Sequence, residues 1–125
     1  MFGFHPVNLA FRFLLELAAL SGMAIGAYAL GTGASAWLLA IAIPLVAIVA
    51  WGTFRVPGDG SASGEAPVAV PGVVRLLIEL DVFAASVFLL WFASPGAAKL
   101  LAAAVVIHYA LSVDRVRWLL TGSEG

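Results

Sequence analysis

Two pairs of oppositely charged residues lie in stretches that are otherwise apolar: Arg12 with Glu16, and Arg75 with Glu79. Four residues are about one helical turn, so each carboxylate lies beside its arginine and can neutralise it. Ionisable groups inside a membrane span are costly and usually face a partner, a cavity or a pathway. The pairs therefore have two interpretations. They are either structural ties between helices, or their glutamates line a shared polar cleft that exchanges a proton or holds a cationic solute.

Four further polar residues extend this candidate site. Asp81 lies two residues after Glu79, about 200° around a helix, and so faces a different side. Counted from the helix ends, Asp81 and His108 reach a comparable depth, which predicts a hydrogen bond between them. Histidine titrates near neutral pH, so this pair would either relay protons or tie two helices together. Asp114 and Arg115 lie nearer the membrane surface.

The sequence carries no signature of an enzyme. It contains no cysteine, which excludes disulfides, thiolate metal sites and cysteine nucleophiles. His5 and His108 lack the spacing of metal ligands, and no pairing of serine with a base and no phosphate loop is evident. We therefore expect no catalytic activity, no metal and no cofactor. The net charge of -1, with scattered arginines, also argues against nucleic acid as a partner.

The elements that must position these residues are four apolar segments. Of the 125 residues, 63% are hydrophobic and only 10% are charged, and the mean hydropathy is +1.10; a soluble domain has about a quarter charged residues. A span takes about 20 residues. The sequence predicts a single all-α domain over residues 1–125, a polytopic four-helix membrane bundle with a flexible polar linker at about 55–71 and helices at about 8–30, 37–54, 73–93 and 97–120.

The distribution of basic residues predicts the orientation of these helices. Cytoplasmic flanks carry an excess of lysine and arginine. In a four-span arrangement Lys99 lies alone on one side, and the other side carries Arg12, Arg55, Arg75, Arg115 and Arg117. We therefore expect a multi-pass protein of the cell membrane, with both termini and the linker in the cytoplasm.

Two patterns indicate how the helices pack. A shift of 63 residues, from Arg12 to Arg75, superposes one charged pair on the other and predicts an internal repeat of two tandem helical hairpins. In the first helix Ala18, Gly22 and Gly26 form a stripe of small residues that lets a neighbouring helix approach closely. That neighbour is either inside the bundle or in a second copy of the chain.

Three stretches resemble one family. They are Asn8-Leu-Ala-Phe-Arg12-Phe-Leu-Leu-Glu16, Trp51-Gly52-Thr53-Phe54 and Arg75-Leu-Leu-Ile-Glu79-Leu80. The chain is similar over nearly its whole length to the YrdB-like family of small uncharacterised membrane proteins. The resemblance implies a four-helix integral membrane protein of prokaryotes, and it brings no established activity, substrate or cofactor. The central linker is longer than we would expect for this family.

Two functions remain open on these grounds. The first is a small proton-coupled transporter or exporter, and the second is a structural or accessory subunit of a larger membrane complex. The lipid bilayer is the expected partner in both cases. The protein partner is then either a second copy in a homodimer or the other members of a larger membrane assembly.

Overall fold

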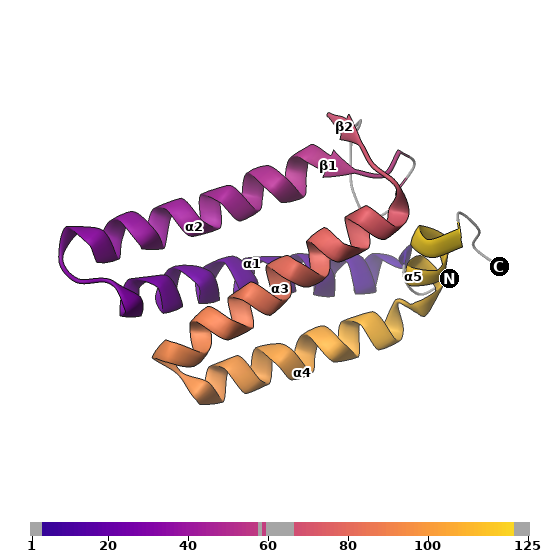
Figure 1. Cartoon of the computed structure of the whole chain (residues 1–125). Coiled ribbons are helices and arrows are strands. Elements are labelled where there is room, and N and C mark those ends of the chain that lie inside the picture. The colour runs from indigo at the N-terminus through magenta and orange to yellow at the C-terminus, as the bar shows by residue number, and fades with distance from the viewer. Residues whose placement is uncertain (1–3, 58, 60–66, 122–125) are drawn as a thin grey trace.

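The computed structural model describes residues 4–57, 59 and 67–121, and this part of the chain is almost entirely helical (Figure 1). The prediction of an all-α fold is confirmed. The only strands among these residues are a parallel pair of two residues each, β1 (Phe54–Arg55) and β2 (Val68–Ala69). The helices are α1 (Pro6–Leu30), α2 (Ala34–Thr53), α3 (Gly72–Ala93), α4 (Pro95–Leu111) and α5 (Val113–Thr121).

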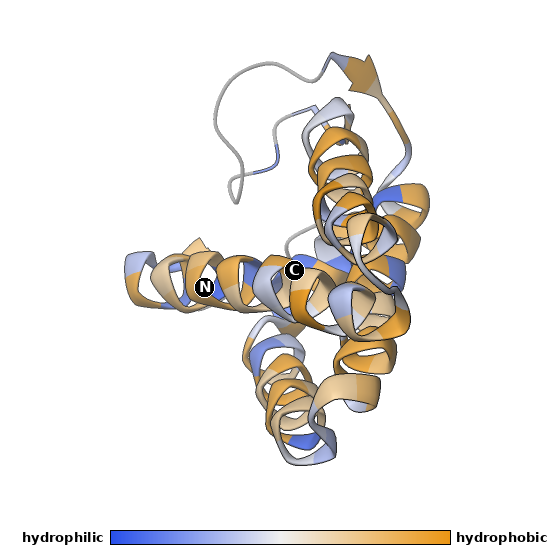
Figure 2. Cartoon of the chain, turned by 90° about the vertical axis from the view of Figure 1, so that its left-hand side faces the viewer, coloured by the Kyte–Doolittle hydropathy of each residue, from blue (hydrophilic) through white to orange (hydrophobic). Residues whose placement is uncertain are grey.

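The four long helices run up and down in chain order, and both termini lie at the same end of the molecule (Figure 1). Helix α1 contacts α2, α3 and α4, and α3 contacts all the other helices. Helix α2 buries only Ala36 and Ala47, so its surface is mostly exposed and apolar (Figure 2). Helices α1 and α3 therefore form the centre of the fold, and α2 lies at its edge.

Tight connections join the helices at the end opposite the termini. Gly33, which precedes α2, has a φ of 54°, a left-handed conformation that glycine adopts without strain. Ser94 alone separates α3 from α4, and its side chain accepts a hydrogen bond from the Ala97 amide at 3.2 Å. Pro95 fits the first turn of α4, where no amide partner is needed.

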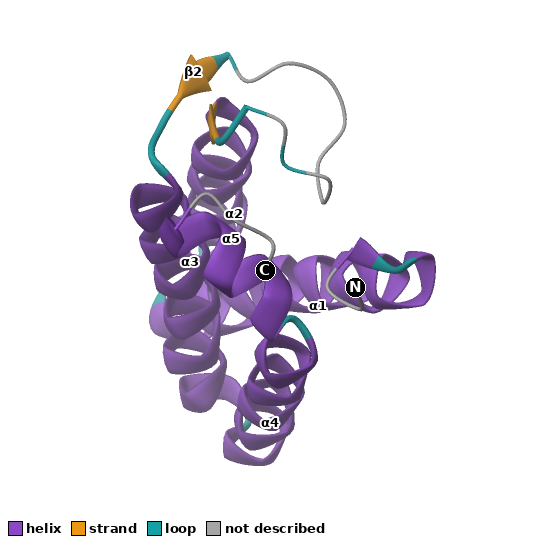
Figure 3. Ribbon diagram, turned by 90° about the vertical axis from the view of Figure 1, so that its right-hand side faces the viewer, coloured by secondary structure: helices purple, strands orange, loops and turns teal. Residues whose placement is uncertain are grey.

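The helix expected over 97–120 is in fact two helices. Helices α4 and α5 meet at Ser112 with a bend of 69°, and α5 lies across the end of the molecule where the termini are found (Figure 3). The Ser112 amide bonds to the carbonyl of Tyr109 at 3.1 Å, a tighter turn than the α-helical one. The Ser112 hydroxyl accepts a hydrogen bond from the side-chain amide of Asn8, from Nδ2 to Oγ at 2.7 Å. The bend is therefore held by one hydrogen bond at the end of α4 and by another from α1.

Part of the linker expected at about 55–71 is among the described residues. Its described residues include the end of β1, all of β2, and Asp59, whose side chain is buried. Asp59 is held by Arg115 of α5. This buried ion pair thus ties the connection to α5.

Close packing joins α1 to α3. Gly22 and Gly26 face Leu90 and Leu89 of α3, and a Cβ at Gly26 would overlap the backbone carbonyl of Leu89. The small residues of α1 therefore contact a neighbour inside the bundle. Ala18 is exposed and does not belong to this contact, contrary to the prediction; the next residue, Ala19, is buried instead.

Several of these helices suit a membrane. Helices α1 and α2 are each long and apolar enough to cross one, and α4 with α5 makes a third such segment when the bent pair is taken as one. Large apolar side chains are exposed along α2, including Trp37, Ile41 and Val46. This surface is compatible with a membrane location because lipid can cover it.

Candidate functional site

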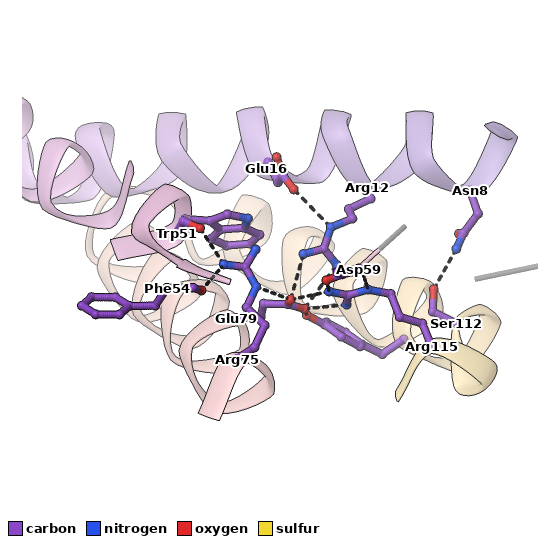
Figure 4. A network of polar contacts seen from close by, with 11 residues as sticks. Asn8, Arg12, Glu16, Trp51, Phe54, Asp59, Arg75, Glu79, Ser112 and Arg115 are labelled. Atoms are coloured by element: carbon purple, nitrogen blue, oxygen red, sulfur yellow. Dashed lines mark hydrogen bonds and ion pairs between the residues drawn. The ribbon is translucent and has the colours of Figure 1, made fainter. Parts of the chain in front are cut away.

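The carboxylate of Glu79 lies at the centre of a buried charge cluster (Figure 4) and is fully shielded, with 0% of the residue exposed. Arg75, one turn earlier on α3, donates from Nε to Glu79 Oε2 at 2.8 Å. Arg12 of α1 donates from Nη1 to Oε1 at 3.2 Å. Arg115 of α5 donates to both carboxylate oxygens, at 2.9 and 2.7 Å. One carboxylate therefore joins three helices.

The cluster also reaches α4 and the linker. The Tyr109 hydroxyl of α4 donates to Glu79 Oε1 at 2.8 Å. Asp59 accepts two hydrogen bonds from Arg115, from Nε at 3.2 Å and from Nη2 at 2.6 Å. This forked pairing of a guanidinium with a carboxylate fixes orientation as well as distance.

Arg75 extends the cluster to α2. Its Nη1 donates to the carbonyl oxygens of Trp51 and Phe54, at 2.6 and 2.9 Å. These carbonyls lie at the C-terminal end of α2, where the helix itself supplies no donor. The end of α2 is thus held against α3 by a charged side chain.

The ion pairs of the cluster within the described residues join equal numbers of positive and negative side chains. Arg12, Arg75 and Arg115 supply three positive charges, and three negative charges come from Glu16, Asp59 and Glu79. Buried charges are tolerated when they are paired and hydrogen-bonded. Within the described ranges, no group of three or more His, Cys, Asp and Glu side chains could hold a metal ion. The cluster has the chemistry of a structural tie.

Glu16 occupies a different environment from Glu79. Its Oε1 lies 3.2 Å from Arg12 Nε, and 28% of its side chain is exposed. Glu16 also lines a cavity of about 240 Å³ between α1, α2 and α3. The other lining residues are all apolar: Leu20, Ala47, Ile48, Trp51, Gly52 and Val82. Among the described residues that line this cavity, Glu16 is present and Glu79 is not, so the two glutamates do not share it.

Trp51 lines this cavity and also contacts two arginines of the charge cluster. Its ring lies 5.4 Å from the guanidinium carbon of Arg12 and 5.3 Å from that of Arg75, within the range of cation–π attraction. The ring also contacts Phe83 edge to face, with centroids 5.3 Å apart. The Trp51 ring thus connects the apolar lining of the cavity with Arg12 and Arg75 of the cluster.

The predicted hydrogen bond between Asp81 and His108 is not formed. Asp81 is exposed on α3, whereas His108 is buried and contacts the ring of Phe11 edge to face. Neither ring nitrogen of His108 has a hydrogen-bond partner within the described part of the chain. Asp81 points away because Glu79, about 200° around α3, is the residue that faces α4 and α5. Asp114 is partly exposed on α5, beside the buried Arg115.

Sequence reasoning missed two members of the cluster. Asp59 lies among glycine and proline residues of the linker, and this composition predicts no buried partner. Tyr109 follows His108 on an apolar helix, and only its polar hydroxyl could have indicated a hydrogen bond there. Both residues reach Glu79 or Arg115 through the tertiary fold rather than through a local pattern.

The fold and the site together define a class: a small, nearly all-helical protein with an apolar surface and a cluster of paired charges centred on a buried carboxylate. Residues 10–107 match the family described as "Protein of unknown function (DUF2568)". The chain is also 37% identical over 118 residues to "Uncharacterized protein YrdB" of Bacillus subtilis (strain 168), over 93% of this chain and 95% of that protein. No solved structure matches. The chain belongs to this YrdB-like family of uncharacterised proteins.

Proposed function

We propose that the chain crosses the cell membrane four times, through α1, α2, α3 and α4, with both termini in the cytoplasm. The short connections at one end and the gathering of both termini at the other support this arrangement (Figure 1). The end with the termini also carries the basic residues Arg55, Arg75, Arg115 and Arg117, as cytoplasmic flanks do. In this arrangement α1–α2 and α3–α4 are two tandem hairpins of the same orientation.

We further propose that the protein is a small proton-coupled transporter whose exchanging group is Glu16. The observation that carries the proposal is a single, partly exposed carboxylate on the wall of an otherwise apolar cavity. Such a wall suits an organic cation, because the carboxylate attracts its charge and the apolar side chains cover its body. Trp51 adds an aromatic face for the same cation.

Glu16 is better suited than Glu79 to exchange partners. Arg12 binds both glutamates, so it stays paired with Glu79 when Glu16 takes a proton or a solute. Glu79 has no such freedom, because three arginines and Tyr109 hold its carboxylate. Proton or cation exchange at Glu16 therefore leaves the buried tie intact.

The cavity limits the size of the solute. Sites for drug-sized ligands occupy roughly 300 to 1,000 Å³, and this cavity of about 240 Å³ is smaller. A compact cation with a short apolar body fits this limit better than a large planar dye. Benzyltrimethylammonium, a quaternary cation with one aromatic ring, is a suitable probe.

Binding of radiolabelled benzyltrimethylammonium to the purified protein tests the site. Glu16→Gln should abolish saturable binding, and Glu16→Asp should retain it. Asp81→Asn is the matched control, because it also removes one carboxylate from a long helix but lies outside the cavity. Unchanged binding in Glu16→Gln, or equal loss in Asp81→Asn, would refute the site.

Flux measurements test coupling. In liposomes with a pH gradient, the wild-type protein should drive uptake of the probe and Glu16→Gln should not, at equal helix content. Binding without flux would leave a cation-binding protein and reject transport.

An accessory subunit of a larger membrane complex is the second candidate function, and neither role includes a catalytic step. Two features favour this role. The charge cluster ties the helices into a stable bundle, and the exposed apolar surface of α2 can contact a neighbouring membrane protein. Stoichiometric co-purification of a defined partner from native membranes, together with no probe binding, would select this role.

A further inference from the structure

One face of α3 carries a stripe of exposed residues with heptad spacing. The stripe advances by three and four residues in turn, which is the spacing that brings one seam of a helix against a partner helix. All of its members are exposed in the single chain, Leu77 by 56% and Phe88 by 64%. We call it the α3 seam, and it consists of Val74, Leu77, Asp81, Ala84, Phe88 and Trp91.

Asp81 is the one charged member of the α3 seam. It is the tenth residue of a 22-residue helix, so it lies near the middle of the proposed span. No hydrogen bond or ion pair holds it among the described residues. Helix α2 is also widely exposed, but it has no charged residue. Lipid alone can cover α2, whereas a carboxylate at this depth requires a polar partner.

A groove runs beside the α3 seam. It has a volume of about 790 Å³, lies between α3 and α4, and shares Ala84, Phe88 and Trp91 with the seam. Its other wall includes Val105 and Val106 of α4, and its lining contains no charged residue. Another helix can lie along the seam and into this groove, with the small Ala84 allowing close approach.

We propose that the α3 seam is the interface of a parallel homodimer, in which α3 of a second copy lies against it across a twofold axis normal to the membrane. In such a pair each seam residue meets its own copy, so Asp81 faces Asp81. Two carboxyl groups that face each other in this way share one proton. The protonated group then donates a hydrogen bond to the ionised one.

A second copy of the chain can place a polar partner against the α3 seam at the level of Asp81. Two copies with the same membrane orientation bring identical residues to the same level. Two exposed basic residues are described in α4 and α5. They are Lys99 and Arg117, and both lie near helix ends. Neither reaches the level of Asp81. The carboxyl pair is self-complementary, which is the condition that a twofold interface imposes.

Introduced cysteines test the interface directly, because the chain has none of its own. Ala84→Cys places a thiol in the α3 seam, and Ala18→Cys, exposed on α1, is the matched control. The full chain is reconstituted at high lipid excess and oxidised. Ala84→Cys should form a disulfide-linked species of twice the 12.9 kDa chain mass, and Ala18→Cys should stay monomeric. Absence of the Ala84→Cys dimer, or equal cross-linking at both positions, would overturn the proposal.

Substitutions of Asp81 in the Ala84→Cys background test the role of the carboxyl group. Asp81→Asn retains both a donor and an acceptor and should keep the cross-link. Asp81→Leu should reduce the cross-linking at least fivefold. Without the carboxyl group, lipid covers the α3 seam just as favourably as a second helix. Undiminished cross-linking in Asp81→Leu, at unchanged helix content, would overturn the carboxyl pair. A product of Ala84→Cys with another mass in native membranes would assign the seam to a different protein and reject the homodimer.

Discussion

Replacing Glu79 by glutamine removes a carboxylate that joins α1, α3, α4 and α5. The variant keeps the size of the side chain and loses its charge. Arg12, Arg75 and Arg115 then face only Glu16 and Asp59 as carboxylates, so one guanidinium is left without a counter-charge in a buried site. The glutamine oxygen can still accept hydrogen bonds, but it cannot serve three arginines and Tyr109 with equal strength.

The expected loss of stability is large. Breaking a buried ion pair by removing one partner costs about 3–5 kcal/mol, and Glu79, which is fully buried, is shared by three such pairs. We therefore expect Glu79→Gln to lower the free energy of unfolding by about 4 kcal/mol or more. Domains have about 5–15 kcal/mol in total, so the variant should be close to unfolding.

Two companion variants make the measurement decisive. Glu16→Gln removes a partly exposed carboxylate with a single arginine partner, and should cost about 1 kcal/mol or less. The double variant Arg75→Gln with Glu79→Gln leaves two intact pairs, Arg12–Glu16 and Arg115–Asp59. It should be more stable than Glu79→Gln alone, because no arginine is left without a counter-charge.

The assay is unfolding in mixed micelles with increasing sodium dodecyl sulfate, followed by helical circular dichroism and tryptophan fluorescence. A Glu79→Gln variant within about 1 kcal/mol of the wild-type protein would refute the reasoning. So would a Glu16→Gln variant that loses as much as Glu79→Gln, because the two carboxylates would then be equivalent.

Three further substitutions have definite expected results. Gly26→Ala should destabilise the bundle by about 2 kcal/mol, because its Cβ would overlap the Leu89 carbonyl; an unchanged unfolding midpoint would contradict this close approach. Asp59→Asn should speed hydrogen exchange of the α5 amides, because Arg115 is then held by one carboxylate instead of two; unchanged exchange would show that Asp59 does not hold α5. Gly52→Ala meets nothing within 4 Å and should stabilise α2 by up to about 1 kcal/mol. Because Gly52 lines the cavity, its substitution should also weaken probe binding; equal affinity would place the probe elsewhere.

The parts of the site that follow from local spacing could be predicted from the sequence. Arg12 with Glu16, and Arg75 with Glu79, are neighbours because both members of each pair stand on one helix. The turns between α1 and α2 and between α3 and α4 follow in the same way from glycine, serine and proline residues. These features need no knowledge of how the helices are arranged.

The parts that depend on helix rotation and on the bend at Ser112 could not be predicted. Matching depth brought Asp81 and His108 together in the sequence interpretation, but depth does not specify which side of each helix faces the other. Likewise, a stripe of small residues does not identify whether Ala18 or Ala19 is buried. Arg115 reaches Glu79 because α5 turns by 69° from α4, and the apolar composition before Ser112 does not indicate that turn.

The position of Arg115 in the chain also constrains how the protein is made. Arg115 follows Glu79 by 36 residues, so a nascent chain already contains Arg12, Glu16, Arg75 and Glu79 when α3 emerges from the ribosome. These four charges cancel, so both helical pairs can form before Arg115 is synthesised. The contacts that Arg115 makes with Asp59 and Glu79 therefore form only after α5 has been synthesised.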